Sequence, residues 1–375
     1  MITTHVLFRR PTALLAFAFC AISPLAHSAE TNNDGAPHFA VYRWGAANQT
    51  GGSKANAAFA AWLNRPFVWA EDFEPIERWE DNIEGGNWQM GEWSDWKKAV
   101  PGRRLILSIP LLPGGWDRSG PKSGSGAGQP VSFAAGAKGE YNEHFRKLAE
   151  QLVKFGLADS ILRLGWEFNG GWYTWRVDKS TKEFAEYWRQ IVKTMRSVPG
   201  AEKLQYCWNP ALGWLSGPAD QAWPGDEFVD IVGLDIYDDS WAADTYPWPT
   251  QASPDEIAAR RQKVWNDVLL KGDHGLLFWK NFADQHHKLF ALPEWGVDNR
   301  EDKHGGGDNV YFVEQMHHFI SDPSNHVYFH CYFDVQAGDG HHQLSPGLSG
   351  NETTEAPKAA ARFNELFSLP KAAAH

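Results

Sequence analysis

The sequence has 375 residues, 20 tryptophans and a formal net charge of −11 at pH 7. Because its lysines and arginines form no cluster, neither nucleic acid nor an anionic polysaccharide is an expected partner. The length, together with the lack of any linker or internal repeat, indicates one large domain rather than two.

The first 28 residues have the pattern of a secretory signal peptide. Arg9 and Arg10 precede the apolar stretch LLAFAF, and the small residues of AHSAE follow it. The apolar stretch is too short to span a bilayer, and no later segment reaches membrane length. We therefore expect a signal peptide over residues 1–28, with cleavage near Ser28 or Ala29, and one folded domain over 29–375. The protein is expected to be periplasmic or extracellular, with no membrane partner.

Eight apolar runs follow along the chain, each ending in turn residues. They cover residues 38–45, 65–73, 104–113, 160–168, 203–210, 229–238, 288–297 and 327–335. Several are nearly continuous in apolar residues, as are strands of a parallel sheet that is covered on both faces.

Helical patterns stand between these runs. Apolar residues from Phe145 to Val153 have helical spacing, and two capping boxes, Ser180 to Glu183 and Ser253 to Glu256, precede further helices. Eight strands alternating with helices predict an α/β fold, a single (β/α)8 TIM barrel. The helices between the earliest strands are the hardest to delimit.

Two carboxylates stand where a barrel of this kind carries its active site. Glu167 ends the fourth run and Glu294 ends the seventh, at the carboxyl ends of the expected strands. Cleavage of a glycosidic bond needs such a pair, one carboxyl to protonate the leaving oxygen and one carboxylate to attack the anomeric carbon. The neighbouring rings of Trp166 and Phe168 favour a raised pKa for Glu167 through desolvation.

Tryptophans are frequent at strand ends and in loops. Examples are Trp44, Trp116, Trp172, Trp175, Trp214, Trp223, Trp241, Trp248 and Trp295. Flat rings can cover the apolar faces of sugars, although many of these residues will serve core or loop packing instead. Trp172 and Trp175, directly behind Glu167, are the strongest candidates for sugar contact. The glycine-rich loops 114–130 and 298–309 are candidates for the rim of a cleft.

Four segments together resemble one enzyme family. RLGWEFNGGWYTW, residues 163–175, resembles the acid/base segment of glycoside hydrolase family 26, which reads roughly Arg-x-x-His-Glu-x-Asn-Gly-x-Trp. WNP at 208–210, WPGDEFVDIVGLDIY at 223–237 and PEWG at 293–296 resemble later segments of that family, in the same order. The likeness extends from about residue 40 to about residue 335.

This resemblance implies a (β/α)8 barrel and a retaining, double-displacement mechanism. By matching position, Glu167 is the expected general acid/base and Glu294 the expected nucleophile. Tyr237 matches a tyrosine that contacts the nucleophile, and Arg163 and Trp172 match the arginine and the sugar-contacting tryptophan of the motif. Further candidates for substrate binding are Trp166, Asn169, Trp175, Asn209 and Trp295.

Two departures from the family pattern concern the sugar pocket. Trp166 stands where family mannanases usually have histidine, and IPLLPGGW stands where many have a histidine near the end of the third strand. The expected activity is hydrolysis of a neutral β-linked polysaccharide, with endo action preferred and exo action left open. β-Mannan is the first expectation, and mixed-linkage β-glucan, β-1,3-xylan and a bacterial exopolysaccharide stay open.

Other site types find less support in the sequence. Three histidine doublets, 286–287, 317–318 and 341–342, have neighbouring side chains that point about 100° apart on a helix, which suits no shared metal. We therefore expect no metal and no cofactor, and His330 is expected to be a hydrogen-bonded barrel residue. Cys207 and Cys331 are expected to be buried thiols.

Additional acids and two other functions stay open. Asp235 is expected to be structural, Asp238 lies near a strand end, and Glu71 or Asp334 could bind sugar hydroxyls or support the nucleophile. One alternative function is a non-catalytic glycan-binding barrel, and another is a periplasmic glycosidase that processes exopolysaccharide. The sequence leaves the oligomeric state open, and a monomer is the simplest expectation.

Overall fold

The computed structural model describes residues 36–43, 52–114, 118–213, 215–347 and 353–369. The predicted signal peptide over 1–28 lies outside these residues, as do Trp44, Trp116 and Trp214. No helix within the described residues is long and apolar enough to cross a membrane.

The described strands form one parallel sheet. They are β1 (His38–Tyr42), β2 (Trp69–Phe73), β3 (Arg104–Ile109), β4 (Ile161–Leu164), β5 (Gln205–Trp208), β6 (Ile231–Gly233), β7 (Ile236–Tyr237), β8 (Leu289–Gly296) and β9 (Val327–Phe333). Hydrogen bonding follows the order β1-β9-β8-β6-β5-β4-β3-β2, and β7 pairs with β8 as well. Since β6 and β7 are two pieces of one barrel strand and β1 contacts β2, eight parallel strands make a nearly closed barrel.

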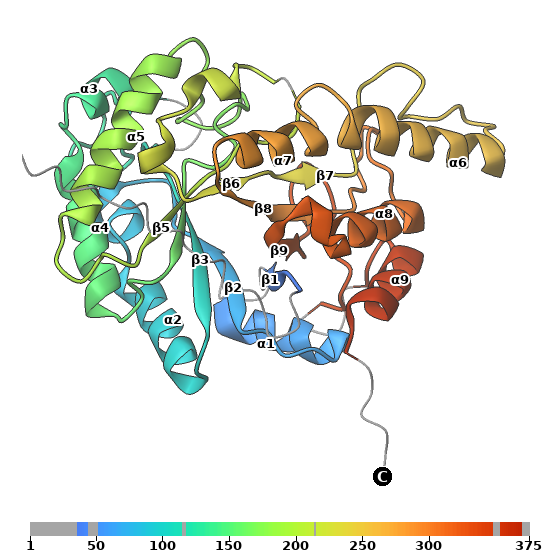
Figure 1. The fold of residues 1–375 in the computed structure, drawn as a ribbon, viewed down its shortest axis with the longest axis horizontal. Helices are drawn as coiled ribbons and strands as arrows, with labels where there is room; N and C mark the ends of the chain where they lie inside the picture. The colour runs from blue at the N-terminus through green and yellow to red at the C-terminus, as the bar shows by residue number, and fades with distance from the viewer. Residues whose placement is uncertain (1–35, 44–51, 115–117, 214, 348–352, 370–375) are drawn as a thin grey trace, which may run out of the picture. The chain divides into compact units, whose positions relative to one another are not determined.

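Helices stand between the strands in the chain (Figure 1). The α-helices are α1 (Gly52–Leu63), α2 (Asn87–Ala99), α3 (Phe133–Ala137), α4 (Asn142–Lys154), α5 (Thr181–Arg196), α6 (Pro254–Lys263), α7 (Leu276–Gln285), α8 (Val310–Ser321) and α9 (Pro357–Phe367). Short π-helical segments are η1 (Trp79–Ile83) and η4 (Val264–Leu270), and 3-10 turns are η2 (Ala219–Ala222), η3 (Asp226–Phe228) and η5 (Pro323–Asn325). The predicted (β/α)8 TIM barrel is confirmed.

The two predicted capping boxes have different outcomes. Ser253 caps α6, since its hydroxyl accepts a hydrogen bond from the backbone N–H of Glu256 at 3.2 Å. The prediction for Ser180 is wrong, because its side chain makes no capping bond and its backbone (φ −94°, ψ 38°) lacks the extended conformation that aims an N-cap side chain at the helix. The helix α5 still begins at Thr181, and its apolar stripe is fully buried, namely Phe184, Trp188, Ile191, Val192 and Met195.

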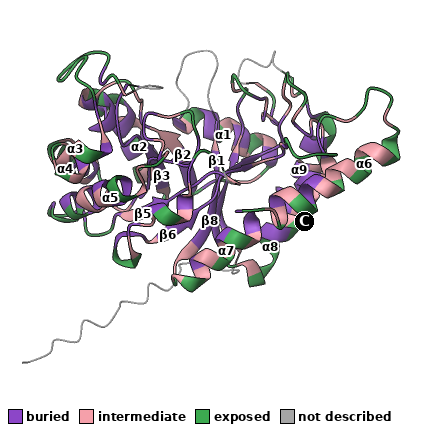
Figure 2. Cartoon of the chain, turned by 90° about the horizontal axis from the view of Figure 1, so that it is seen from above, coloured by how far each residue is buried: buried purple, intermediate pink, exposed green. Residues whose placement is uncertain are grey.

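The interior of the barrel is layered. Its lower layer is apolar and includes Ala40, Trp69, Ile106, Ile161, Cys207, Ile231, Ala291 and Phe329. Side chains two positions apart on a strand share a face, so the residues two steps further on form the next layer toward the carboxyl ends. On β2 to β5 this second layer is polar, with Glu71, Ser108, Arg163 and Asn209, all buried. Figure 2 shows the strands as the most continuously buried elements, whereas α6 has no buried residue.

Candidate active site

Arg163, the third residue of β4, organises the polar layer of the barrel. Its side chain is fully buried, and all five of its N–H groups have acceptors. Nε donates to Oδ1 of Asn209 at 2.7 Å, Nη1 to Oγ of Ser108 at 2.9 Å and to Oε1 of Glu71. Nη2 donates to Oδ2 of Asp235 at 2.6 Å and to Oε1 of Glu294 at 2.7 Å. One guanidinium therefore ties together the carboxyl ends of five other strands.

The charges around Arg163 are unequal, since three carboxylates face one guanidinium. Burial lowers the pKa of Arg163, but Asp235, Glu71 and Glu294 outweigh burial and the pKa ends well above its ordinary value. Burial also raises the pKa of Glu71 to about 7 and that of Asp235 well above its ordinary value, although Arg163 opposes both shifts. Such buried acids stay protonated more readily than exposed ones, which limits the excess negative charge here.

Glu294, on β8, is held as an acceptor of hydrogen bonds. Oε1 accepts from Arg163, and Oε2 accepts from the hydroxyl of Tyr237 at 2.7 Å. The backbone N–H of Glu294 donates to Oδ1 of Asp235 at 3.1 Å, which fixes the strand at this point. A cation and a phenol on the two oxygens stabilise a carboxylate, which suits a nucleophile.

Glu167 stands in a tight turn directly after β4. Its φ is 51°, a left-handed conformation that is uncommon for a residue with a side chain. Its backbone N–H donates to the carbonyl of Asn209 at 2.8 Å, which anchors the turn to the end of β5. Gly165 has a φ of 56°, and a Cβ there would lie 2.6 Å from the side chain of Leu111, so this turn requires glycine. Backbone strain of this kind concentrates at functional sites.

The environment of Glu167 favours its protonated form. Burial, and next to it repulsion from Glu294, raise the pKa of Glu167 to about 8, while the hydrogen bond from Trp172 acts in the opposite direction. That bond joins Nε1 of Trp172 to Oε2 of Glu167 at 2.8 Å. A carboxyl that keeps its proton near neutral pH can act as a general acid.

The two glutamates face each other at short range. One oxygen each of Glu167, Asp235 and Glu294 lie within 4.8 Å of one another. Retaining glycosidases have their two carboxyl groups about 5–5.5 Å apart, whereas inverting ones need about 6.5–9.5 Å to admit a water. The same three oxygens are the one group with metal-ligand proximity among the described residues, and none of the histidine doublets belongs to it. The guanidinium of Arg163 already neutralises two of the three.

Aromatic side chains at strand ends line the surroundings of the pair. Tyr42, Phe73, Tyr237 and Phe333 are the last residues of β1, β2, β7 and β9, and each is half-buried. Their rings are in mutual contact, with centroids 4.6 Å apart for Tyr42 and Phe73, and 5.9 Å apart for Tyr237 and Phe333. Three of these four were not singled out from the sequence. The available signal was an aromatic residue at the end of an apolar run.

The structure does not support the predicted sugar contacts of two tryptophans. Trp175 and Trp295 are fully buried. Nε1 of Trp175 donates to the carbonyl of Trp166 at 2.8 Å, and the ring of Trp295 packs against Phe363 and Phe367 of α9. Both are core residues, since their rings offer no face to a substrate.

Three further candidates also lie below the surface. Asn169 is fully buried and exchanges two hydrogen bonds with the backbone of Ala211, which ties the Glu167 turn to the end of β5. Asn209 is fully buried against Arg163. Trp166 is nearly fully buried, and its Nε1 donates to the hydroxyl of Tyr173 at 3.0 Å. These residues shape the site from beneath, so direct contact with substrate, as predicted for them, is not what the structure supports.

Trp172 lies beside Glu167 with 38% of its surface exposed, so the predicted sugar contact stays a prediction for this ring. Trp241 is more exposed still, in the loop after β7, where its ring stacks on His304 of the predicted rim loop 298–309. Trp223 and Trp248 are half-buried and pack on the core.

The remaining acids have supporting roles. Asp238 accepts hydrogen bonds from Tyr246 at 2.9 Å and from Asn309 at 2.7 Å, which fixes the predicted rim loop. Asp334 accepts from the backbone N–H of Leu344 at 2.7 Å and pairs with Arg43. Neither Asp238 nor Asp334 belongs to the group of close carboxylate oxygens.

Predictions for the cysteines and for His330 are confirmed. Cys207 and Cys331 are both free and buried. Nδ1 of His330 accepts a hydrogen bond from Nε1 of Trp295 at 3.2 Å, so this histidine is a bonded residue of the barrel wall.

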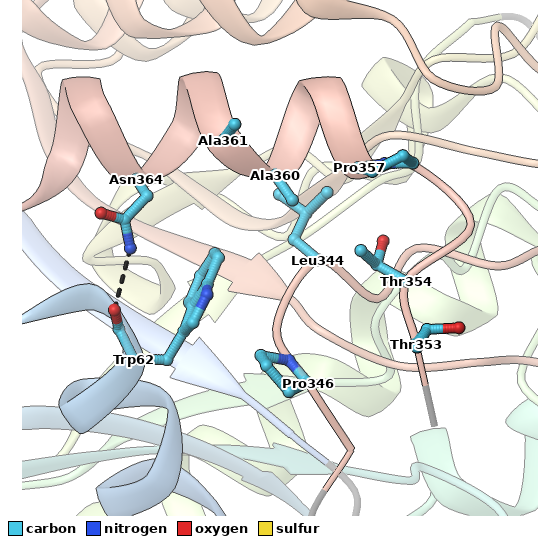
Figure 3. A pocket seen from close by; sticks show the side chains of 9 residues that line it. All are labelled: Trp62, Leu344, Pro346, Thr353, Thr354, Pro357, Ala360, Ala361 and Asn364. Atoms are coloured by element: carbon cyan, nitrogen blue, oxygen red, sulfur yellow. Dashed lines mark hydrogen bonds between the residues drawn. The ribbon is translucent and has the colours of Figure 1, made fainter. Parts of the chain in front are cut away.

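A hollow of about 510 Å³ lies on the flank of the barrel, between α1 and α9 (Figure 3). Its lining residues are Trp62, Leu344, Pro346, Thr353, Thr354, Pro357, Ala360, Ala361 and Asn364. Asn364 bridges the two helices, because its Nδ2 donates to the carbonyl of Trp62 at 2.9 Å. No lining residue carries a carboxylate, so this hollow does not contain the carboxyl pair that glycosidic cleavage needs.

Residues 135–251 match the sequence model of a family described as glycosyl hydrolase family 26. This match assigns residues 135–251 to a family 26 domain. The match includes Arg163, Glu167, Asn209 and Tyr237 and ends before Glu294, so the nucleophile position rests on the geometry described above.

A relative found by sequence agrees with this match. The chain is 26% identical over 246 residues to a mannan endo-1,4-β-mannosidase of Bifidobacterium adolescentis, an alignment that covers 62% of this chain. The chain spans only 23% of the length of that relative.

Solved structures show the same fold at lower identity. An endo-β-1,4-mannanase double mutant of Cellulomonas fimi gives a TM-score of 0.57 at 17% identity, covering 89% of this chain and 72% of that one. The catalytic domain of a family 26 endo-β-1,4-mannanase of Bacillus sp. JAMB-750 gives 0.57 at 17%, covering 88% and 84%. A family 26 β-mannanase of Bacteroides ovatus gives 0.53 at 14%, covering 91% and 95%.

Proposed function

We propose that the protein is an exported, retaining endo-β-glycanase that hydrolyses a neutral β-linked polysaccharide, with β-mannan as the first substrate to test. The observation that carries the proposal is the proximity of Glu167 and Glu294, whose oxygens lie within 4.8 Å. This separation leaves no room for a water between the carboxyl groups and therefore favours double displacement.

In the first step Glu294 attacks the anomeric carbon while Glu167 protonates the leaving oxygen. The bond from the anomeric carbon to the leaving oxygen breaks, and a bond to a carboxylate oxygen of Glu294 forms. Arg163 and Tyr237 orient Glu294 for this attack through their hydrogen bonds to its two oxygens. The proton of Glu167 is retained until this step because burial raises the pKa of that carboxyl.

In the second step Glu167, now ionised, takes a proton from water. The resulting hydroxide equivalent attacks the anomeric carbon, the ester to Glu294 breaks, and Glu167 regains its proton. Two inversions at one carbon leave the product with the configuration of the substrate.

The choice of polysaccharide rests on general features and on the names of the relatives. An acidic protein with acidic groups at its reaction centre disfavours an anionic polymer, because like charges repel. The similar proteins are a mannan endo-1,4-β-mannosidase and endo-β-1,4-mannanases, which favours β-mannan. The exposed ring of Trp172 next to Glu167 suits stacking on a sugar ring at the cleavage point.

The test is product analysis with residues 29–375 on a panel of β-mannan, mixed-linkage β-glucan, β-1,3-xylan and exopolysaccharide. Glu167→Gln and Glu294→Gln are assayed beside the wild-type protein, since glutamine keeps the side-chain shape without the acid chemistry. Oligosaccharides released from one polymer, with retained configuration and only by the wild-type protein, support the proposal. Activity that persists in Glu294→Gln contradicts it.

Two alternative functions are decided by the same panel. Binding of a polymer without any cleavage would support the non-catalytic glycan-binding barrel. Cleavage of exopolysaccharide alone would instead support the periplasmic exopolysaccharide glycosidase, and detection of the protein in the periplasm or the medium tests the proposed export.

A further inference from the structure

Gly170 and Trp172 form a close contact beside Glu167. The indole of Trp172 lies so near to Gly170 that a Cβ on this glycine would stand 2.4 Å from Cζ2 and 2.5 Å from Cε2 of the ring. No side chain fits there without displacing the indole, because real Cβ contacts do not reach such distances. The backbone N–H of Gly170 donates to the carbonyl of Glu167 at 2.9 Å, which closes the turn.

The position of the indole fixes the hydrogen bonding of Glu167. Nε1 of Trp172 is a donor only, and it stands 2.8 Å from Oε2 of Glu167. Oε1 of Glu167 has no hydrogen-bond partner within the described part of the chain. In a protonated carboxyl the oxygen that faces a donor must be the carbonyl oxygen, so the proton is directed to the other oxygen.

We propose that Gly170 and Trp172 act as one positioning unit, in which the bare Cα of Gly170 accommodates the indole and the indole N–H assigns the catalytic proton to Oε1 of Glu167. This inference rests on the proposed role of Glu167 as acid/base. It adds that neither oxygen can replace the other, and that Gly170 serves proton transfer without touching the substrate.

The hydrogen bond also affects both chemical steps. When Glu167 gives up its proton, the bond from Trp172 becomes charge-assisted and strengthens, so it favours proton donation. Glu167 faces other charged or titratable groups as well. They are Glu294 on β8, Arg163 on β4, Asp235 after β6, Tyr237 on β7, Tyr173 in its own loop and Asp339 after β9. None of these depends on Gly170, so substitution of Gly170 isolates the contribution of Trp172.

The experiment measures kcat/KM against pH for Trp172→Phe, which keeps a ring but lacks the donor, and for Gly170→Ala, which keeps the donor but blocks its position. Each is assayed on an unactivated oligosaccharide and on an aryl glycoside whose leaving group needs no protonation. We expect kcat/KM on the oligosaccharide to fall about tenfold or more, and on the aryl glycoside by less than about threefold. The alkaline limb of the kcat/KM profile should move to higher pH by about half a unit or more in both variants. Each variant loses the hydrogen bond that favours the ionised form of Glu167.

Gly171→Ala is the matched control. A Cβ on this neighbouring glycine would have its nearest contact at 4.0 Å, and wild-type profiles are expected. The kcat/KM of the double variant Gly170→Ala/Trp172→Phe should be no more than about twofold below that of Trp172→Phe alone. Both changes remove the same interaction, so their effects should not add. Thermal unfolding of every variant identifies a misfolded protein, and Trp172→Phe, at a partly exposed position, still tests the proposal if Gly170→Ala does not fold.

An unmoved alkaline limb in Trp172→Phe, or equal losses on the two substrates, would overturn the positioning unit. Failure of the proposed function is a separate result. It would appear as the absence of any wild-type activity that Glu167→Gln abolishes.

Discussion

Nη2 of Arg163 donates to Oε1 of Glu294 at 2.7 Å, across the interior of the barrel from β4 to β8. The same guanidinium holds four other acceptors, so the position of the nucleophile depends on the ends of several strands at once. A planar group with five N–H donors in fixed directions can do this, whereas an ammonium cannot.

We expect Arg163→Lys to reduce kcat by about 10²-fold or more, because lysine keeps the charge but cannot reach five acceptors. Initial rates on the polymer cleaved by the wild-type protein measure this effect. Arg104→Lys is the matched control. Arg104 also donates to three acceptors, but it begins β3 at the opposite end of the strand, so activity should be retained. Similar losses in both variants would argue against a specific role for Arg163.

Tyr237→Phe removes the hydrogen bond to Oε2 of Glu294 and leaves the ring. We expect kcat/KM to fall by about tenfold to a hundredfold with little change in the melting temperature. Tyr246→Phe removes a hydrogen bond to Asp238 instead and should lower the melting temperature while activity persists. An unchanged kcat/KM in Tyr237→Phe would show that the phenol does not stabilise Glu294 during the reaction.

The pH dependence of hydrolysis should show an alkaline limit set by Glu167. Since this carboxyl must carry a proton in the first step, and burial raises its pKa to about 8, kcat/KM is expected to fall as the pH rises through about 8. A pH profile of the wild-type protein, limited to the range in which the protein remains folded, measures it. An alkaline limb below pH 6 would be incompatible with the environment described for Glu167.

Stability should also depend on pH through Glu71. Burial raises the pKa of Glu71 from 4.5 to about 7, so the folded chain binds more protons than the unfolded chain between these values. The free energy of unfolding therefore falls as the pH rises from about 4.5 to about 7. The glutamine of Glu71→Gln cannot ionise. The free energy of unfolding of this variant, measured in denaturant titrations, should therefore fall less over this pH range.

Glu365→Gln serves as the control for Glu71→Gln, since Glu365 is an exposed residue of α9. The free energy of unfolding of this control should change with pH as it does in the wild-type protein. Identical slopes in Glu71→Gln and the wild-type protein would show that Glu71 is not protonated in the folded state.

The barrel and the placement of its two glutamates followed from the sequence because both depend on local patterns. Apolar runs mark strands, and Glu167 and Glu294 end two of them. The contacts of Glu294 with Arg163 and Tyr237 agree with the same motifs.

The orientation of the tryptophans could not be derived in the same way. Trp172 and Trp175 are three residues apart, yet one is exposed and the other fully buried. The left-handed turn at Gly165 and Glu167 decides which ring faces the core, and this turn has neither helical nor strand periodicity. The aromatic residues around the pair come from β1, β2, β7 and β9, and only barrel closure brings such distant positions together.

The region between β2 and α2 shows no helical periodicity of apolar residues in the sequence, and the structure gives a local reason. Here η1 is a π-helical segment in which Asp81 has a φ of 57° and Glu80 an extended backbone. A helix interrupted in this way shows no continuous apolar stripe.

The most direct test of the central claim is to trap the covalent intermediate. A 2-deoxy-2-fluoro glycosyl fluoride of the sugar that the enzyme releases slows both steps, and the second more than the first, so the glycosyl-enzyme accumulates. Mass spectrometry of a proteolytic digest then locates the added sugar. We predict label on Glu294, absent in Glu294→Gln. Label on Glu167, Glu71 or Asp235, or turnover with inverted configuration and no label, would contradict the account.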